Sequence, residues 1–344
     1  MDDKFAKPQT RRDAPSVLVL SRSSIAALLS PSDYLAAVET ALKAEAEGRT
    51  RAPPPLHIPT ESGGFHAKGA YLTLADDRAF AAVKVNGNFP GNPKRNGLPT
   101  IQGAIVLSDA NTGALLALMD SIEVTLRRTA AATALAMRSL ARPDADVVSI
   151  CGCGDQARAQ LEAIADARRI RKVYAVDIDP SARARFAKTL TADLRLDIVA
   201  EPDLAKAARA SGIIVTCTTS RTPFLGRDHV APGTFVAAVG ADAPDKSELM
   251  PDLMAIAKVV VDSPAQCTAM GDLHHAIAAR AIPDGHFHAT LSDLVAGRKP
   301  GRTNADEITI FDSTGVAIQD VAAAIRIYER ASAQGTGLAI QLAL

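Results

Sequence analysis

The sequence predicts an α/β protein with a doubly wound parallel sheet in its second half. Between residues 147 and 263, short apolar runs alternate with segments of helical spacing. The runs are apolar at nearly every position, which is typical of strands buried on both faces of a parallel sheet. Regular alternation of strand and helix is the pattern of a doubly wound fold. The expected strands are VVSIC (147–151), RKVYAVDID (171–179), LDIVA (196–200), GIIVTCTT (212–219), TFVAAVG (234–240) and KVVVDS (258–263).

The preceding region, residues 20 to 125, predicts an α+β unit with a smaller antiparallel or mixed sheet. Residues 31–48 carry apolar side chains at helical spacing. Short strand-like runs follow, and we expect Asn86-Gly87 and Asn96-Gly97 to form turns beside them. The runs are RAPPPLHIP (51–59), AAVKVNGNFPGN (81–92), GAIVLSDANTG (103–113) and LLALMDSIEV (115–124).

Two helices are expected to connect these regions. An Ala-rich helix over roughly Thr125–Leu140 leads into the second region, and a helix from Val316 returns to the first after ITIFDSTG (308–315). The prediction is therefore a domain of residues 126–315 inserted into one made of residues 16–125 plus 316–344. Residues 1–15 are expected to be a flexible tail.

The composition argues against several classes of function. The chain has 344 residues with 38 Lys and Arg against 38 Asp and Glu, and this balance disfavours nucleic acid as a partner. No apolar run reaches the roughly 18–20 residues that cross a bilayer, so no membrane partner is expected. Four cysteines without disulfide spacing and a charged N-terminus without a signal sequence favour a cytoplasmic location.

A glycine-rich loop follows the first expected strand of the second region. Gly152-x-Gly154-x-x-Ala157 has the spacing of the Rossmann dinucleotide fingerprint. A helical pattern begins at about Gln156, and Asp155 and Gln156 are also expected to lie at the cofactor. The first glycine permits a tight turn and the second lets the backbone approach a pyrophosphate at the helix N-terminus. A small third residue lets the helix pack closely on the strand. The loop predicts a bound dinucleotide.

An acidic residue at the end of the next strand indicates which dinucleotide. Asp177 lies 25 residues after Gly152. A carboxylate there accepts hydrogen bonds from the adenine ribose hydroxyls and repels a 2′-phosphate, so NAD is favoured over NADP.

The cysteines of the glycine loop could instead suggest a redox or metal site. Cys151-Gly-Cys153 lacks C-x-x-C spacing, and no second cysteine pair lies at zinc-site spacing. The histidines of His274-His275 and of the DGHFH segment (284–288) have no matching acidic or cysteine partner. No metal site is therefore expected.

Four separated blocks of the sequence resemble the ornithine cyclodeaminase/µ-crystallin family. They are VKVNGNFPGN (83–92), MDSIEVTLRRTAAATALA (119–136), AAVGADAPDKSEL (237–249) and IFDSTGVAIQDVAAA (310–324), in the family's order, and the likeness covers roughly residues 20 to 335. The resemblance implies a substrate-binding and dimerisation domain, completed by the C-terminal helix, around an inserted Rossmann domain. It implies a homodimer, as do the sheet edges that a single copy would leave exposed. Members of the family include cyclodeaminases, cyclic ketimine reductases, alanine dehydrogenase-like enzymes and dinucleotide-binding crystallins.

The resemblance also implies roles for individual residues. Lys84 resembles the family's active-site lysine, and Arg51 and Arg128 resemble the pair that binds the substrate α-carboxylate. Asp242 resembles the acid/base carboxylate. The positions expected to lie near the cofactor are Thr100, Thr218 and Ser313.

These residue types suit the chemistry that the resemblance implies. Arginine forks bind a carboxylate bidentately. A lysine can polarise an imine, and its pKa falls when it is desolvated beside other cations. An aspartate can carry the proton that accompanies hydride transfer, while NAD performs the hydride chemistry. Arg127 adjoins Arg128, and because helical neighbours point about 100° apart only one can face the site.

One stretch departs from the pattern of ornithine cyclodeaminases. Those enzymes place an acidic residue in the strand before the lysine, where it can meet the distal amino group of ornithine. Here GGFHAKGAYL puts His66 at that position, with Lys68 two residues further on. A cation-capable pair suits a second carboxylate or a polar tail better than an ammonium. The alternative is that both side chains lie at a strand edge and contact nothing.

The prediction is thus an NAD(H)-dependent enzyme that interconverts an L-amino acid and its imine by hydride transfer at the α-carbon. Two alternatives remain open at this point. One is a cyclodeaminase-type lyase, which converts L-ornithine to L-proline and ammonia with NAD recycled. The other is a non-catalytic binder of a dinucleotide and a small ligand, like the crystallins of the family.

Overall fold

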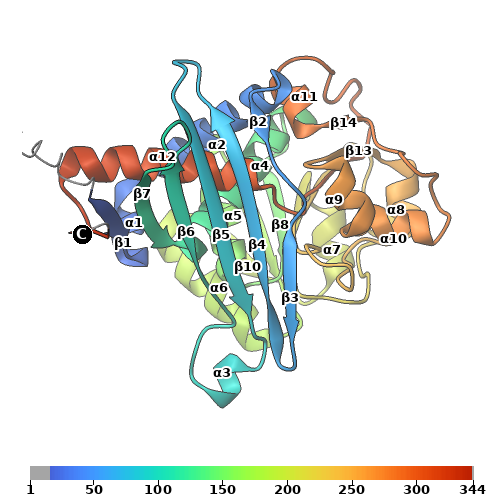
Figure 1. Ribbon diagram of the computed structural model, residues 1–344. Helices are drawn as coiled ribbons and strands as arrows, with labels where there is room; N and C mark the ends of the chain where they lie inside the picture. The colour runs from blue at the N-terminus through green and yellow to red at the C-terminus, as the bar shows by residue number, and fades with distance from the viewer. Residues whose placement is uncertain (1–15, 343–344) are drawn as a thin grey trace, which may run out of the picture.

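The computed structural model describes residues 16–342, which form two eight-stranded sheets that share an apolar core (Figure 1). The tail expected for residues 1–15 lies outside the described residues, as do residues 343–344. No helix within residues 16–342 is long and apolar enough to cross a membrane.

The second-half sheet is wholly parallel, and all six expected runs form strands in it. The strand order is β10–β9–β8–β11–β12–β15–β13–β14. The chain winds outward from β8 to β10 and then crosses back to β11. This reversal leaves a crevice at the carboxyl ends of β8 and β11, where such folds bind ligands. The strands are β8 Val147–Cys151, β9 Lys172–Val176, β10 Ile198–Ala200, β11 Ile213–Thr216, β12 Phe235–Ala238, β13 Lys258–Val261, β14 Ala289–Thr290 and β15 Thr309–Asp312.

The continuous apolar strands are explained by packing on both faces of this sheet. In β11, Ile213 and Val215 belong to the cluster that includes α4 (Ser121–Leu140), α5 and α6, whereas Ile214 belongs to the cluster that includes α7, α8 and α10. Helices therefore cover both faces, as a doubly wound sheet requires. The helices after α4 are α5 Asp155–Ala167, α6 Pro180–Leu194, α7 Leu204–Arg209, α8 Pro251–Ile256, α9 Pro264–Ala269, α10 Asp272–Ala278 and α11 Leu291–Val295, with a 3₁₀ turn at Arg227–His229.

The first sheet is mixed, because β1 runs parallel to β7 while its other pairs are antiparallel. The order is β16–β1–β7–β6–β5–β4–β2, and β3 also pairs with β4. Its strands are β1 Val17–Leu20, β2 Thr50–Arg51, β3 Leu56–Thr60, β4 Gly63–Thr73, β5 Ala79–Asn88, β6 Ile101–Asp109, β7 Leu115–Asp120 and β16 Leu338–Ile340.

Three long helices pack on one face of the mixed sheet, and Figure 1 shows the other face bare. The helices are α2 Pro31–Ala46, α4 Ser121–Leu140 and α12 Ala317–Gln334. The short helix α1 Arg22–Leu28 contacts α4, α12 and β7, and the short helix α3 Asn92–Arg95 lies beyond the ends of the strands, at the bottom of Figure 1. Helix α2 begins with a capping box between Ser30 and Asp33 and has Pro31 in its first turn. Helix α12 contacts β4 and β5, so the chain returns to the first sheet after β15.

The domain boundaries proposed from the sequence remain a prediction. Helix α4 spans the boundary at residue 125 and contacts α2, α12 and β6 of the first unit as well as α5, β12 and β15 of the second. It begins four residues earlier than the sequence suggested, because the Asp120 side chain accepts hydrogen bonds from the backbone N–H groups of Ile122 and Glu123. The segment SIEV is therefore helical and not part of a strand.

The turn expected at Asn86-Gly87 is wrong, because both residues lie inside strand β5. Gly87 does not adopt a positive φ. A Cβ there would lie 3.1 Å from the Phe65 ring and 3.2 Å from the Phe89 ring, so the glycine makes room for two aromatic side chains. Close packing, not turn chemistry, explains this glycine. The other pair is in a loop, where Gly97 has a φ of +64°.

Candidate active site

The glycine loop between β8 and α5 has the shape that a dinucleotide requires. Gly152 has a φ of +94°, and a Cβ on it would lie 2.9 Å from the carbonyl oxygen of Cys217. Gly154 is the N-cap of α5, and a Cβ on it would meet nothing within 4 Å. Protein packing thus requires the first glycine, whereas the second borders open space at a helix N-terminus that suits a phosphate. Ala157 is fully buried against the sheet.

Asp177, which follows β9, forms a hydrogen bond with the backbone of the glycine loop. Its Oδ2 accepts a 2.7 Å hydrogen bond from the Cys153 N–H, and its Oδ1 accepts one of 2.9 Å from the Asp179 N–H. The carboxylate is half-buried, so it still borders solvent beside the loop. Asp155 is exposed in the first turn of α5. The residues present therefore fit a dinucleotide with free ribose hydroxyls.

The cysteines of this loop are packed as small apolar residues. Burial raises the pKa of the Cys153 thiol to about 12, with a contribution from the charge of Asp177. Burial also raises the pKa of Cys151. Neither thiol is activated as a thiolate. Within residues 16–342, no group of three or more His, Cys, Asp or Glu side chains is placed to hold a metal ion.

Lys84 lies on β5 and points into the protein, where it is 6 % exposed. Its Nζ is 2.8 Å from Oδ2 of Asp320 and donates a 3.3 Å hydrogen bond to Oγ1 of Thr125. Burial lowers the pKa of Lys84 to about 8, with the charge of Asp320 opposing this shift and that of Arg128 adding to it. Near neutral pH this lysine can therefore both hold and release a proton.

Arg128 binds the other oxygen of the same carboxylate. Its Nε lies 3.0 Å from Oδ1 of Asp320, and its Nη1 donates a 3.2 Å hydrogen bond to Oε1 of Gln319. A Cβ on Gly315 would lie 2.8 Å from Nη1 of Arg128, so the glycine makes room for the guanidinium. The neighbour Arg127 points elsewhere and pairs with two glutamates of α4 and α5.

Asp320 was not anticipated from the sequence. Burial alone would raise the pKa of its carboxyl, but the charges of Arg128 and Lys84 outweigh burial and hold the pKa below its usual range. Asp320 is therefore an ionised carboxylate between two buried cations. A signal for it existed, since Gln319 and Asp320 are adjacent polar residues in the otherwise apolar segment GVAIQDVAAAI.

Lys68 lies directly opposite Lys84 in the pairing of β4 with β5. Its Nζ donates hydrogen bonds to the carbonyl oxygens of Thr314 (3.2 Å) and Gly315 (2.8 Å) and to Oε1 of Gln266 (3.2 Å). Burial lowers the pKa of Lys68, and the charge of Arg128 lowers it further. The idea that this side chain contacts nothing is wrong.

His66 and Asp242 are close enough for the charge of one to act on the other. His66 is half-buried and stacks on His57 of β3, with ring centroids 4.3 Å apart and an interplanar angle of 14°. Asp242 is 53 % exposed and pairs with Lys246 at 2.5 Å. The charge of Asp242 acts to raise the pKa values of both His66 and Lys68, although burial is the larger effect and lowers both.

Arg51 and Thr100 lie outside this cluster of contacts. Arg51 is exposed on β2, opposite Tyr71 of β4, and its side chain forms no hydrogen bond or ion pair with the residues that the structure describes. Thr100 is half-buried immediately before β6, where its carbonyl oxygen accepts a 2.8 Å hydrogen bond from the Phe89 N–H. Neither side chain is placed against Lys84 by a contact within this chain.

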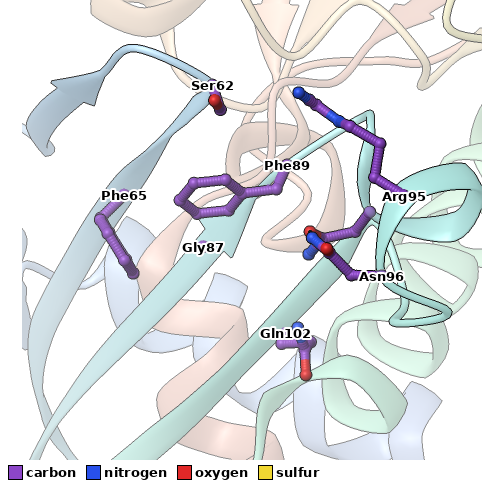
Figure 2. Close-up of a pocket in the computed structure, with 8 residues that line it drawn as sticks. Ser62, Phe65, Gly87, Phe89, Arg95, Asn96 and Gln102 are labelled. Atoms are coloured by element: carbon purple, nitrogen blue, oxygen red, sulfur yellow. The ribbon is translucent and has the colours of Figure 1, made fainter.

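A cavity of about 520 Å³ lies beside the loop that holds Thr100, and none of the side chains lining it belongs to the Lys84 cluster. Figure 2 shows the rings of Phe65 and Phe89 on one side and Arg95 and Asn96 on the other. Its lining residues are Ser62, Phe65, Gly87, Phe89, Asn92, Arg95, Asn96 and Gln102.

Ser313 lies at the crossing from β15 to α12 and is buried. Its hydroxyl donates a 2.9 Å hydrogen bond to Oδ2 of Asp262, which also accepts one of 2.6 Å from the Gly315 N–H. Oδ1 of Asp262 accepts a 3.1 Å hydrogen bond from the Thr314 hydroxyl. This buried carboxylate therefore fixes the segment whose carbonyl groups bind Lys68.

Glu248 fixes the loops on the other side of the crevice. Its Oε1 accepts hydrogen bonds from the Thr218 N–H and hydroxyl (2.6 and 2.7 Å), and its Oε2 from the Thr216 hydroxyl (2.7 Å) and the Gly240 N–H (2.9 Å). Burial, with the charge of Asp272, raises the pKa of this carboxyl to about 7. Thr218 is thus held beside Gly152, and its hydroxyl is already engaged within the protein.

The two parts of the site meet on one turn of α4. Gln156, in the first turn of α5, donates a 3.3 Å hydrogen bond to the carbonyl oxygen of Leu126. Leu126 lies between Thr125, which contacts Lys84, and Arg128. The glycine loop and the buried ion cluster are therefore anchored to the same helical turn.

Comparison with known proteins gives this arrangement a family. The ornithine cyclodeaminase/mu-crystallin family matches residues 16–335. An archaeal alanine dehydrogenase dimer with bound NAD has 36 % sequence identity and a TM-score of 0.90, covering 95 % of this chain and 99 % of that one. The chain belongs to the ornithine cyclodeaminase/mu-crystallin family.

Two further solved structures are similar over nearly the whole chain. The Δ1-pyrroline-2-carboxylate reductase of Thermococcus litoralis, in complex with NADH and L-proline, has 34 % identity and a TM-score of 0.88 and covers 94 % of this chain and 99 % of that one. The iminosuccinate reductase of Paracoccus denitrificans, in complex with NAD⁺, has 33 % identity and a TM-score of 0.87, and the match covers 95 % of this chain and 100 % of that one.

The raised pKa of Glu248 gives a pH-dependent prediction for Glu248→Gln. A folded-state pKa of about 7, above the ordinary value of 4.5, means that the folded protein binds more protons than the unfolded chain between these pH values. This residue's contribution to the free energy of unfolding therefore decreases as the pH rises through that range. In urea unfolding, the free energy of unfolding of the wild type minus that of Glu248→Gln should decrease from about pH 5 to about pH 8. The exposed control Glu61→Gln should show no such trend, and a difference that grows with pH would contradict the raised pKa.

Proposed function

We propose that this protein is an NAD(H)-dependent enzyme that interconverts an L-amino acid and its imine. The observation that carries the proposal is the buried cluster of Lys84, Asp320 and Arg128 on the turn of α4 that also anchors the glycine loop. The three similar structures are named as amino-acid dehydrogenase or imine reductases, and each is described with NAD, NADH or NAD⁺. The net reaction is amino acid plus NAD⁺ to imino acid, NADH and a proton.

The residues that would hold the dinucleotide are those of the β8–α5 loop and the end of β9. Gly152 permits the tight turn and Gly154 leaves room for the pyrophosphate at the N-terminus of α5, and Asp177 would accept hydrogen bonds from the adenine ribose. The nicotinamide supplies the hydride acceptor or donor when bound.

The remaining chemistry is assigned to the chain's own side chains. Arg128 has guanidinium donors beyond those bound to Asp320 and Gln319, and these suit the α-carboxylate of the substrate. Lys84, with its pKa near 8, would hold or release the proton at the substrate nitrogen. Asp242, whose charge acts on Lys68, would serve as a second proton-carrying group.

Lys84→Met tests the assignment of the lysine. The variant removes the proton-carrying amine but keeps an unbranched side chain, so kcat/KM for imine reduction should fall by about 100-fold or more. NADH affinity, measured by fluorescence titration, should stay within about threefold, because Lys84 makes no contact with the glycine loop. Normal turnover by the variant would refute the role of Lys84.

The pH dependence of the wild type provides a second measurement on the same residue. Reduction needs protonated Lys84, so its rate should fall as the pH rises through about 8, whereas oxidation should rise through the same range. The charge of Asp320 raises the pKa of Lys84, so in Asp320→Asn the fall in the reduction rate and the rise in the oxidation rate should both occur at lower pH. If the pH at which the two rates change were the same in Asp320→Asn as in the wild type, the titrating group would not be Lys84.

Asp177→Asn tests the preference for NAD over NADP. The amide oxygen can still accept the hydrogen bond from the Cys153 N–H, so the contact with the glycine loop is kept while the charge and the hydrogen bond from the Asp179 N–H are lost. The ratio of the dissociation constants for NADPH and NADH should fall by about tenfold, because the repulsion of the 2′-phosphate is removed. Asp179→Asn, two residues away at the N-cap of α6, should leave the ratio unchanged. An unchanged ratio in Asp177→Asn would contradict the ribose assignment.

We also propose that the protein is a homodimer joined through the bare face of the mixed sheet. One register row across four strands is Gly69, Val83, Val106 and Leu118, and its three apolar side chains are exposed. A continuous apolar face of this kind is typical of a protein–protein interface. The similar archaeal alanine dehydrogenase is described as a dimer.

Val83→Lys tests this interface. A charge at the centre of the face should convert a dimer to a monomer, because an unpaired buried lysine is costly in an apolar contact. Light scattering after gel filtration should give twice the chain mass for wild type and about half of that for the variant. Ile256→Lys, on an exposed position of α8, should remain dimeric. A monomeric wild type would rule out the proposal.

A further inference from the structure

We infer that the substrate of this site is a dicarboxylic amino or imino acid, whose second carboxylate binds on the side of Lys68 and His66. The inference rests on the proposed function and concerns the one feature that the relatives leave open. Their names include an alanine dehydrogenase, with a single-carboxylate amino acid, and an iminosuccinate reductase, with a two-carboxylate imino acid.

Three cations gather where the inner face of the mixed sheet meets α4. Lys68, Lys84 and Arg128 act on one another, because the charge of Arg128 lowers the pKa values of both lysines. Two of these three cations pair with the single carboxylate of Asp320. The cluster therefore carries two uncompensated positive charges.

Lys68 is the member of the cluster without a carboxylate within ion-pair distance among the described residues. Its three hydrogen bonds go to neutral oxygens, which satisfy its donors but do not neutralise its charge. Lys84 is its direct cross-strand neighbour, and like charges at that position destabilise a sheet. An anion bound here would remove that cost.

The nearest acidic side chains are already engaged elsewhere. Both oxygens of Asp262 accept hydrogen bonds from the segment Ser313–Gly315. Asp242 is exposed and pairs with Lys246. Their charges act on Lys68 from a distance but leave it without an ion-pair partner.

The number of charges then decides between substrate classes. A monocarboxylic amino acid is a zwitterion, and its imino acid offers one carboxylate, which Arg128 can bind. A second carboxylate would meet the charge of Lys68 and complete the balance of the cluster. His66 lies two residues from Lys68 on β4, so both side chains are on the same face of the sheet. Its imidazole can donate a hydrogen bond to the same carboxylate.

The first test compares substrates that differ only in this charge. Initial rates of NADH formation should be measured with L-aspartate, L-asparagine, L-glutamate and L-glutamine. We expect at least one acid to exceed its own amide by about 100-fold in kcat/KM, because an amide leaves the cation unpaired. Equal or higher kcat/KM for both amides would overturn the inference.

Lys68→Met tests whether Lys68 causes the preference for the acid over its amide. The ratio of kcat/KM for the acid to that for its amide should fall by about tenfold or more in Lys68→Met and be largely kept in Lys68→Arg. Lys43→Met, on the outer surface of α2, is the control and should keep the wild-type ratio. An equal loss for acid and amide in Lys68→Met would mean that Lys68 has only a structural role, and would overturn the inference.

A binding measurement separates this inference from the proposed function. Calorimetry on the enzyme–NADH complex should show tighter binding of succinate than of succinamate, and Lys68→Met should remove the difference. Selective binding of succinate without turnover of any amino acid would refute the proposed function and leave the dicarboxylate site standing. Turnover of L-alanine or L-proline with no preference for succinate would refute the dicarboxylate site alone.

Discussion

One buried carboxylate, Asp320, organises the candidate active site. It lies between Lys84 of β5 and Arg128 of α4, and both of these cations are buried. Two buried cations without an anion between them would be strongly destabilising. Asp320 belongs to α12, which the chain reaches only after the whole parallel sheet has been made. The site is therefore complete only when the last helix has packed on the first sheet.

The buried carboxylates of the parallel-sheet unit hold loops in place and, within the described residues, do not pair with buried cations. Glu248 and Asp262 accept hydrogen bonds mainly from backbone N–H and hydroxyl groups. They fix the loops that follow β11, β12 and β15, and these loops border the crevice. Beside the segment that Asp262 fixes, Lys68, Lys84 and Arg128 outnumber the one carboxylate that pairs with them, Asp320. An excess of positive charge suits an anionic substrate.

Much of the fold was predictable because its signals are local. Continuous apolar runs marked the buried strands, and the glycine spacing marked the β8–α5 loop. The errors also have local causes. Asn86-Gly87 has the sequence of a turn, but the rings of Phe65 and Phe89 explain its glycine. The start of α4 was placed too late, because the capping by Asp120 was missed.

The sequence by itself determined the fold class, the dinucleotide loop and the family, since each depends on short-range pattern and spacing. It also singled out Lys84 and Arg128, through resemblance. Only the tertiary structure decided that Asp320 joins them, that Lys68 binds Thr314 and Gly315, and that Arg51 stays exposed. The physical reason is that charge compensation in a buried site depends on distance in space. Residues 84 and 320 are far apart in the chain, and no local sequence pattern indicates that their side chains are in contact.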